Sequence, residues 1–191
     1  MSDLLKVKVG GSRYLCKWEK TIQVGNIKYP IVRVGDQWWI TEDLKNDVGV
    51  YWVVNGVHYY KPNGDGYRAL MALFPAGWRI TTLSDLQTLN NLYSGHLEQL
   101  CSTEGWDGLG TNESGLNFLQ NGAMDLQGRM VNVNESLHMR QYDASRPSIN
   151  NDTYSYILYI SGNSIVSRFA QPDNYNMYYP GRVPLRICCN A

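Results

Sequence analysis

The stretch IVRVGDQWWI, residues 31–40, predicts a β-hairpin that sets the fold of the chain. Two arms rich in β-branched and aromatic residues flank a Gly35-Asp36 pair. A two-residue loop of this kind between such arms is typical of an antiparallel hairpin. We expect Trp38 and Trp39 to lie in the hydrophobic core, because aromatic side chains on strands mostly pack inside.

Similar patterns on both sides of this hairpin predict further antiparallel pairing. Residues 21–24 and 27–29 flank Gly25-Asn26, and residues 50–60 turn at Asn55-Gly56, which is a strong hairpin signal. Strands are also expected in an N-terminal hairpin and in four late segments, at residues 5–9, 12–17, 137–142, 154–160, 165–169 and 183–189.

Two short helices are expected between the hairpins and the late strands. Residues 67–74 suit a helix that stops before Pro75, because the residue before a proline disfavours the helical conformation. Thr82, followed three positions later by Asp85, has the form of a helix N-cap and opens a helix through about Tyr93. The expected apolar face of this second helix comprises Leu83, Leu86, Leu89 and Leu92.

Glycine and asparagine dominate residues 102–128, which predicts a long ordered loop region. Compact domains usually keep such a region for function or as framework. Asp107, Asn112 and Glu113 could supply oxygens for a structural ion, although Gly/Asn loops have this composition without one. With no linker or repeat, the elements together predict one domain of the α+β class.

The charge balance and hydropathy of the chain limit its partners. The 191 residues carry 17 basic and 17 acidic side chains and a formal net charge of zero at pH 7. Nucleic acid is therefore not an expected partner. No apolar run approaches the ~18 residues that a membrane span needs, so we expect no membrane insertion. The N-terminus has no stretch of signal-peptide length, which predicts a chain not secreted by that route or a leader that has been removed.

The titratable residues show no pattern typical of an enzyme or a metal site. The four cysteines have no CxxC spacing, so zinc is not expected, and free buried thiols are simpler than one or two disulfides. The histidines at 58, 96 and 138 do not neighbour a nucleophile motif. We predict no catalytic residues, no metal, no cofactor and no enzyme activity.

The segment 142–181 has the composition of a recognition surface. Of its residues, 21 are Tyr, Asn, Ser or Asp, and it holds seven of the chain's 14 tyrosines. Tyrosine supplies large contact area at low entropic cost, while Ser and Asn supply adaptable hydrogen bonds. The alternative is a loop-rich Tyr/Asn segment that binds no ligand.

Several motifs, in order, are similar to those of one family. Residues 34–44 (VGDQWWITEDL) and 74–82 (FPAGWRITT) resemble the opening motif and the Pro-x-Gly-Trp-Arg block of FISUMP-type, or major paralogous, domains. Residues 100–102 with Trp106, residues 112–117 (NESGLN) and residues 184–187 (PLRI) resemble the later motifs. The resemblance extends from residue 31 to residue 189, and the Pro-x-Gly-Trp-Arg block is its most specific part.

The resemblance implies a C-type-lectin-like fold with twisted antiparallel sheets, two helices and a long loop region that carries the binding surface. Phe74 and Ile187 stand where the family has cysteines, so the disulfide that usually joins these positions is expected to be absent. That absence fits a protein assembled inside a cell better than a secreted lipoprotein.

C-type-lectin folds that lack a signal peptide and end in a segment rich in Tyr, Asn, Ser and Asp are similar to the variable proteins of diversity-generating retroelements. Many of these are receptor-binding proteins at phage tail tips. The retroelement randomises adenines, mostly in AAC-type codons, which yields Tyr, Asn, Ser and Asp but never Lys, Glu, Gln, Met or Trp. The last Lys, Trp and Glu are Lys61, Trp106 and Glu135, which agrees with a variable region at about residues 138–184. Gln141, Gln171 and Met177 lie in this region but cannot be variable positions under this hypothesis.

Under this hypothesis, tyrosines anchor the ligand and Asn and Asp form a hydrogen-bonding rim. The alternative for Tyr154 and Tyr156 is a half-buried strand, because alternation does not tell which face is exposed to solvent. Gln171-Pro172-Asp173 resembles the calcium motif of galactose-binding C-type lectins, but no Trp follows it and a second ligand set is missing, so we predict no calcium site. The expected ligand-binding residues are Arg140, Tyr142, Asn150, Asn151, Asp152, Tyr154, Tyr156, Asn174, Tyr175, Asn176, Tyr178 and Tyr179.

The leading hypothesis is a phage tail-tip or fibre receptor-binding protein that displays a diversified surface to a bacterial surface glycan or protein. It would be made in the host cytoplasm and carried in the virion tail. The alternative is a bacterial cell-surface FISUMP adhesin or carbohydrate-binding module; a third is an enzyme that shares the fold. Residues 1–30 are expected to form a β-hairpin extension for homo-oligomerisation or attachment, and residues 31–191 the ligand-binding domain.

Overall fold

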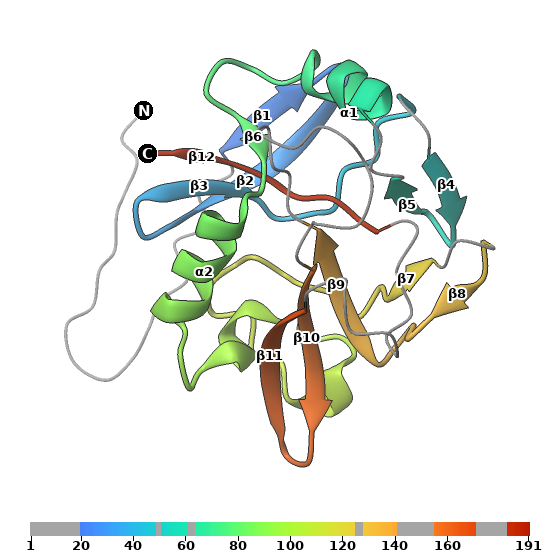
Figure 1. The fold of residues 1–191 in the computed structure, drawn as a ribbon. Coiled ribbons are helices and arrows are strands. Elements are labelled where there is room, and N and C mark those ends of the chain that lie inside the picture. The colour runs from blue at the N-terminus through green and yellow to red at the C-terminus, as the bar shows by residue number, and fades with distance from the viewer. Residues whose placement is uncertain (1–19, 49–50, 61–63, 125–127, 141–154, 171–182) are drawn as a thin grey trace.

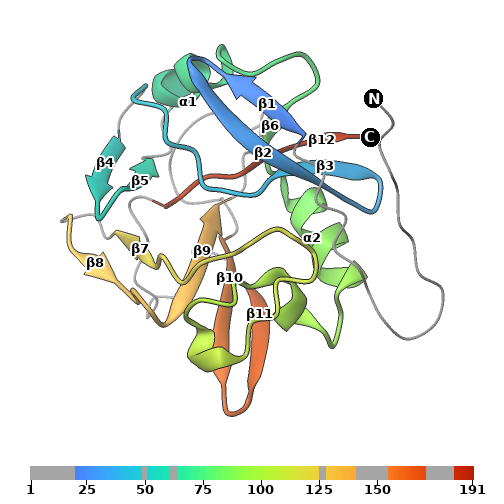
Figure 2. The same ribbon diagram turned by 180° about the vertical axis from the view of Figure 1, so that it is seen from behind.

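The computed structural model describes residues 20–48, 51–60, 64–124, 128–140, 155–170 and 183–191. Every strand pair in this part of the chain is antiparallel, and two α-helices accompany the sheets, which is an α+β arrangement (Figures 1 and 2). The expected fold class is therefore confirmed at this level.

The largest sheet has five strands in the order β1-β2-β3-β12-β6. The hairpin predicted from residues 31–40 is present, with Val34 paired to Gln37 across its turn. The late strand β12 lies between β3 and β6, where Cys188 pairs with Trp39. The strands are β1 (Thr21–Val24), β2 (Ile27–Val34), β3 (Gln37–Ile40), β6 (Arg79–Ile80) and β12 (Ile187–Asn190).

A three-stranded sheet, β11-β10-β9, lies at the other end of the molecule (Figure 1). Two small hairpins, β4-β5 and β7-β8, lie beside each other at one side of the molecule (Figures 1 and 2). These strands are β9 (Ser136–Arg140), β10 (Ser155–Ser161), β11 (Ser164–Ala170), β4 (Tyr51–Val54), β5 (Val57–Tyr60), β7 (Ala123–Met124) and β8 (Met130–Val131).

Both helices occur near their predicted positions. The first, α1 (Gly64–Met71), begins and ends three residues earlier than expected. The second, α2 (Leu83–Leu92), has the predicted cap: Thr82 Oγ1 accepts a hydrogen bond from the Asp85 amide, and the Asp85 side chain accepts one from the Thr82 amide. Short 3₁₀ turns follow at Leu97–Leu100 and Trp106–Gly108.

The five-stranded sheet is buried on both faces where its central strands lie. Trp39 and Cys188 belong to one core cluster, which also contains Trp106 and Leu158. Their chain neighbours Ile40 and Ile187 belong to a second cluster on the opposite face. Alternation along a strand sends successive side chains to opposite faces, so each of these short strands serves two cores. Trp39 is fully buried, as predicted, while Trp38 is only partly buried.

A buried ion pair connects three segments that are distant in sequence. Arg186 is 2% exposed, and its Nε donates to Asp43 Oδ1 at 2.6 Å. Its other nitrogens donate to the carbonyl oxygens of Ile40, Leu116 and Asn117 at 3.0–3.3 Å. Asn121 donates to the second Asp43 oxygen. Both charges are thus fully paired, which is the condition for burying them.

The described cysteines, Cys101, Cys188 and Cys189, are free and buried, as expected. The predicted domain boundary after residue 30 falls inside β2, and Ile22 and Tyr29 are buried in the second core. Residues 20–30 therefore belong to the main sheet. Residues 1–19, which hold Cys16 and the rest of the predicted extension, lie outside the described residues. In the described part, no helix is long and apolar enough to cross a membrane.

Candidate functional site

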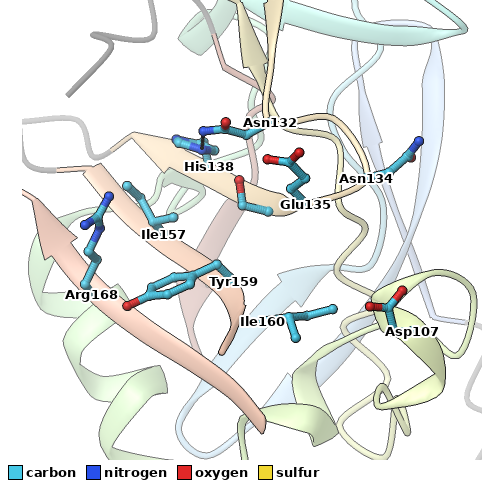
Figure 3. Close-up of a pocket in the computed structure, with 10 residues that line it drawn as sticks. Asp107, Asn132, Asn134, Glu135, His138, Ile157, Tyr159, Ile160 and Arg168 are labelled. Carbon is cyan, nitrogen blue, oxygen red and sulfur yellow. Dashed lines mark hydrogen bonds between the residues drawn. The ribbon is translucent and has the colours of Figure 1, made fainter. Parts of the chain in front are cut away.

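A pocket of about 440 Å³ opens on the face of the β9-β10-β11 sheet that is turned away from the core (Figure 3). Three strands, the turn before β9 and the second 3₁₀ turn contribute side chains to it. The residues that line the pocket are Asp107, Asn132, Asn134, Glu135, Ser136, His138, Ile157, Tyr159, Ile160 and Arg168.

Strand register explains how the middle of this pocket is built. Ile157 pairs with His138 on one side and Arg168 on the other, so these three residues form one row across the sheet. Tyr159 pairs with Ser136 in the next row. Tyr156 and Leu158 on β10 alternate with these residues and are buried in the core.

His138 is buried in the wall of the pocket and is neutral at pH 7. Its side chain is contacted by Asn132, whose Nδ2 lies 3.4 Å from His138 Nε2 (Figure 3). Burial, and to a smaller extent the positive charge of Arg168, lower the pKa of His138 to about 4. His138 Nδ1 and Ser136 Oγ are both buried and have no hydrogen-bond partner in the described structure.

The charged groups of the pocket lie around this neutral centre. Arg168 is exposed, and its guanidinium carbon lies 5.6 Å from the centre of the Tyr159 ring, an arrangement that favours a cation–π contact. Asp107 lies on the opposite side of the pocket from Arg168, and Glu135 lies between them along the edge (Figure 3). No ion pair joins the three among the described residues.

Left-handed backbone conformations shape the edge of the pocket. Asp107, Asn132 and Asn134 have φ values of 50°, 55° and 61°. Asn and Asp tolerate this region better than other residues with a side chain, because a short polar side chain can hydrogen-bond locally. The sharp turns that bring three polar side chains to the pocket therefore depend on these residue types.

One residue of the predicted ligand surface is inside the protein. Tyr156 is fully buried, and its hydroxyl donates to Asn90 Oδ1 at 3.2 Å. The prediction was wrong for this residue. The alternation of side chains along a strand determines which residues share a face, but not which face is exposed to solvent.

The other predicted ligand-binding residues are not tested by the structure. Arg140 pairs with Ser155 at the end of β9. The Gln171-Pro172-Asp173 motif lies outside the described residues. So do the remaining ten predicted ligand-binding residues, which are Tyr142, Asn150, Asn151, Asp152, Tyr154, Asn174, Tyr175, Asn176, Tyr178 and Tyr179.

Sequence reasoning missed most of the pocket. Asn132, Asn134, Glu135 and Ser136 precede the predicted variable region, and only the pair of asparagines just before a strand could have indicated tight turns there. Asp107 was considered as an ion ligand. In the described chain, no group of three or more His, Cys, Asp or Glu side chains could hold a metal ion.

The pocket contains titratable side chains, so its existence does not exclude catalysis. Its hydroxyl candidate, Ser136, receives no hydrogen bond from His138 or any other described group. A serine nucleophile needs an adjacent base that takes its proton. The arrangement as it stands offers hydrogen bonds to a ligand instead of an activated nucleophile.

Comparisons with protein-family models, with curated proteins and with solved structures give no match to this chain. Its function is therefore argued from its own residues.

Proposed function

We propose that the chain is a receptor-binding protein whose ligand surface includes the outward face of the β9-β10-β11 sheet. The pocket on this face carries the proposal, because Tyr159 and Arg168 lie in it and come from the segment with the composition of a recognition surface. Exposed tyrosine and arginine side chains are enriched at the energetic centres of binding surfaces.

We propose further that the α+β arrangement is C-type-lectin-like. In support, three segments that resemble FISUMP motifs contribute neighbouring strands of one sheet, β3, β12 and β6. A fourth, residues 112–117, is held by Arg186 of the last motif through the Leu116 and Asn117 carbonyls. Motifs far apart in sequence thus meet in one framework, as expected of residues that define a fold.

The protein would act at the tip or fibre of a phage tail, where a retroelement diversifies its ligand surface toward bacterial receptors. A bacterial cell-surface adhesin or carbohydrate-binding module with the same surface is the alternative. Neighbouring genes separate the two: reverse transcriptase and tail genes favour the first, and a lipoprotein signal favours the second. A template repeat that differs from the 3′ end of the gene at adenines alone would establish diversification.

A whole-cell binding screen tests the proposed surface. The labelled full chain is incubated with a panel of bacteria, and the screen is repeated with Tyr175, Tyr178 and Tyr179 changed to Ala. We expect at least about a tenfold loss of affinity for a bound strain, since truncated tyrosine anchors commonly cost this much. Tyr51→Ala, on β4 away from this sheet, is the matched control. Binding to no strain, or equal loss in the control, would contradict the proposal.

A further inference from the structure

The chemistry of the pocket narrows the class of ligand it can hold. Eight of its ten lining residues have side chains that form hydrogen bonds, and the two exceptions are Ile157 and Ile160. The volume of about 440 Å³ lies within the range of roughly 300–1,000 Å³ that is usual for small-molecule sites. A ligand that is mainly apolar would leave most of these polar groups without partners, so a polar ligand fits better.

The balance of charge argues against a strongly anionic ligand. Asp107 and Glu135 contribute two carboxylates, and Arg168 contributes the single cation, because His138 is neutral. A phosphate-rich ligand would therefore meet more negative than positive charge. A metal ion is not favoured either, since the described residues contain no suitable cluster of ligands and Arg168 faces the same space.

Two polar side chains are buried in the wall of the pocket. Ser136 is 3% exposed and His138 is 5% exposed, yet neither Ser136 Oγ nor His138 Nδ1 has a hydrogen-bond partner. Buried polar atoms in proteins are nearly always satisfied by protein, water or ligand. Trp39 Nε1, His58 Nδ1 and Gln120 Nε2 are also buried without a partner among the described residues, so this feature is not confined to the pocket.

Hydroxyl groups suit this set of partners because each can donate and accept a hydrogen bond. The carboxylates of Asp107 and Glu135 accept, the guanidinium of Arg168 donates, and the amides of Asn132 and Asn134 do both. Arg168 is already held over the Tyr159 ring, so its fork of donors is oriented before a ligand arrives. Neighbouring hydroxyls on a sugar ring match such a fork.

We propose that this pocket binds a saccharide unit of the receptor through direct hydrogen bonds and without a metal ion. The inference rests on the proposed function, because it names the ligand class of the same surface. It also adds Asp107, Asn132, Asn134, Glu135 and Arg168 to the residues that contact the ligand. Arg168 and Glu135 provide the sharpest tests because both are exposed and pair with no other described charge.

Periodate treatment of bound cells tests the ligand class, because it cleaves vicinal diols and leaves most protein surface in place. We expect loss of binding after periodate, unchanged binding in EDTA, and at least about a tenfold loss for Arg168→Ala and for Glu135→Gln. Arg33→Ala and Glu104→Gln, which alter exposed residues outside the pocket, are expected to bind within about twofold of the unaltered protein.

Three results would overturn the inference while leaving receptor binding intact: binding that survives periodate, binding that EDTA abolishes, or pocket variants that bind like their controls. A protein that binds no cells in any state would overturn both this inference and the proposed function. Circular dichroism of each variant separates lost contact from lost folding. Because all four substitutions are at exposed side chains, each variant is expected to fold.

Discussion

Two arginines of this chain lie in opposite kinds of polar cluster. Arg186 is 2% exposed and donates hydrogen bonds to Asp43 and to three backbone carbonyls. Arg168 is exposed, lies over the Tyr159 ring and faces a pocket whose carboxylates pair with no described cation. A closed cluster stabilises the fold, whereas an open cluster has hydrogen bonds left for a ligand. Whether the polar groups of a cluster are satisfied thus distinguishes the framework from the proposed binding surface.

The largest expected effect is at the closed cluster. Asp43→Ala leaves the Arg186 charge buried without its partner, so we expect the free energy of unfolding to fall by about 3–5 kcal/mol. Urea denaturation followed by tryptophan fluorescence measures this change. The double variant Asp43→Leu/Arg186→Met should recover part of the loss, since it leaves no buried charge. A loss below about 1 kcal/mol for Asp43→Ala would show that the pair is not part of the framework.

Much of the framework could be predicted because local patterns determine it. The hairpin of residues 31–40 and the capped start of α2 at Thr82 follow from turn and cap chemistry over a few residues. The burial of Arg186 could not be predicted, because arginine is mostly exposed and its partners come from distant segments. Leu92, expected on the apolar face of α2, is 55% exposed because only the middle of that helix meets the core.

The second effect is a pH dependence that arises at the pocket wall. The folded pKa of His138 is about 4, against an ordinary value of 6.5. As the pH falls from 6.5 toward 4, the unfolded chain binds a proton that the folded chain excludes, so stability falls. The loss reaches up to about 3 kcal/mol near pH 4. Urea denaturation across this range measures it, and NMR should show His138 still neutral at pH 5.5.

Replacement of His138 by Gln is expected to flatten the pH dependence of stability between 6.5 and 4. His96→Gln, which alters an exposed histidine outside the pocket, is measured in parallel as the matched control. If His138 titrated near its ordinary pKa, solvent would reach the pocket wall. The contrast between this wall and the solvent-excluded cluster around Arg186 would then weaken.

The smallest expected effect is at the open cluster. Arg168→Ala should change the free energy of unfolding by less than about 0.5 kcal/mol, as is usual for exposed positions. It should also raise the pKa of His138, because it removes the positive charge that helps to lower it. Urea denaturation and NMR titration measure the two quantities. Destabilisation as large as that of Asp43→Ala would mean that Arg168 is framework, and the comparison between the two arginines would fail.

The residues of the pocket were harder to predict than the framework. Composition predicted a variable region that includes two of the pocket residues, Tyr159 and Arg168. It could not assign faces, so Tyr156 was placed on the surface although it is buried. Asn132 and Asn134 were missed because their contribution depends on backbone turns that bring a preceding segment against β9, and no local pattern encodes that contact.

Because β12 is the last strand of the described chain, the five-stranded sheet is complete only when the chain has been translated through this strand. Cys188 and Ile187 complete the middle of the five-stranded sheet, yet the ribosome makes them after every other strand of the described structure. A frameshift or stop codon anywhere upstream removes this strand and leaves two cores open. Truncated chains are thus expected not to fold, so only full translation of the described sequence yields the folded protein.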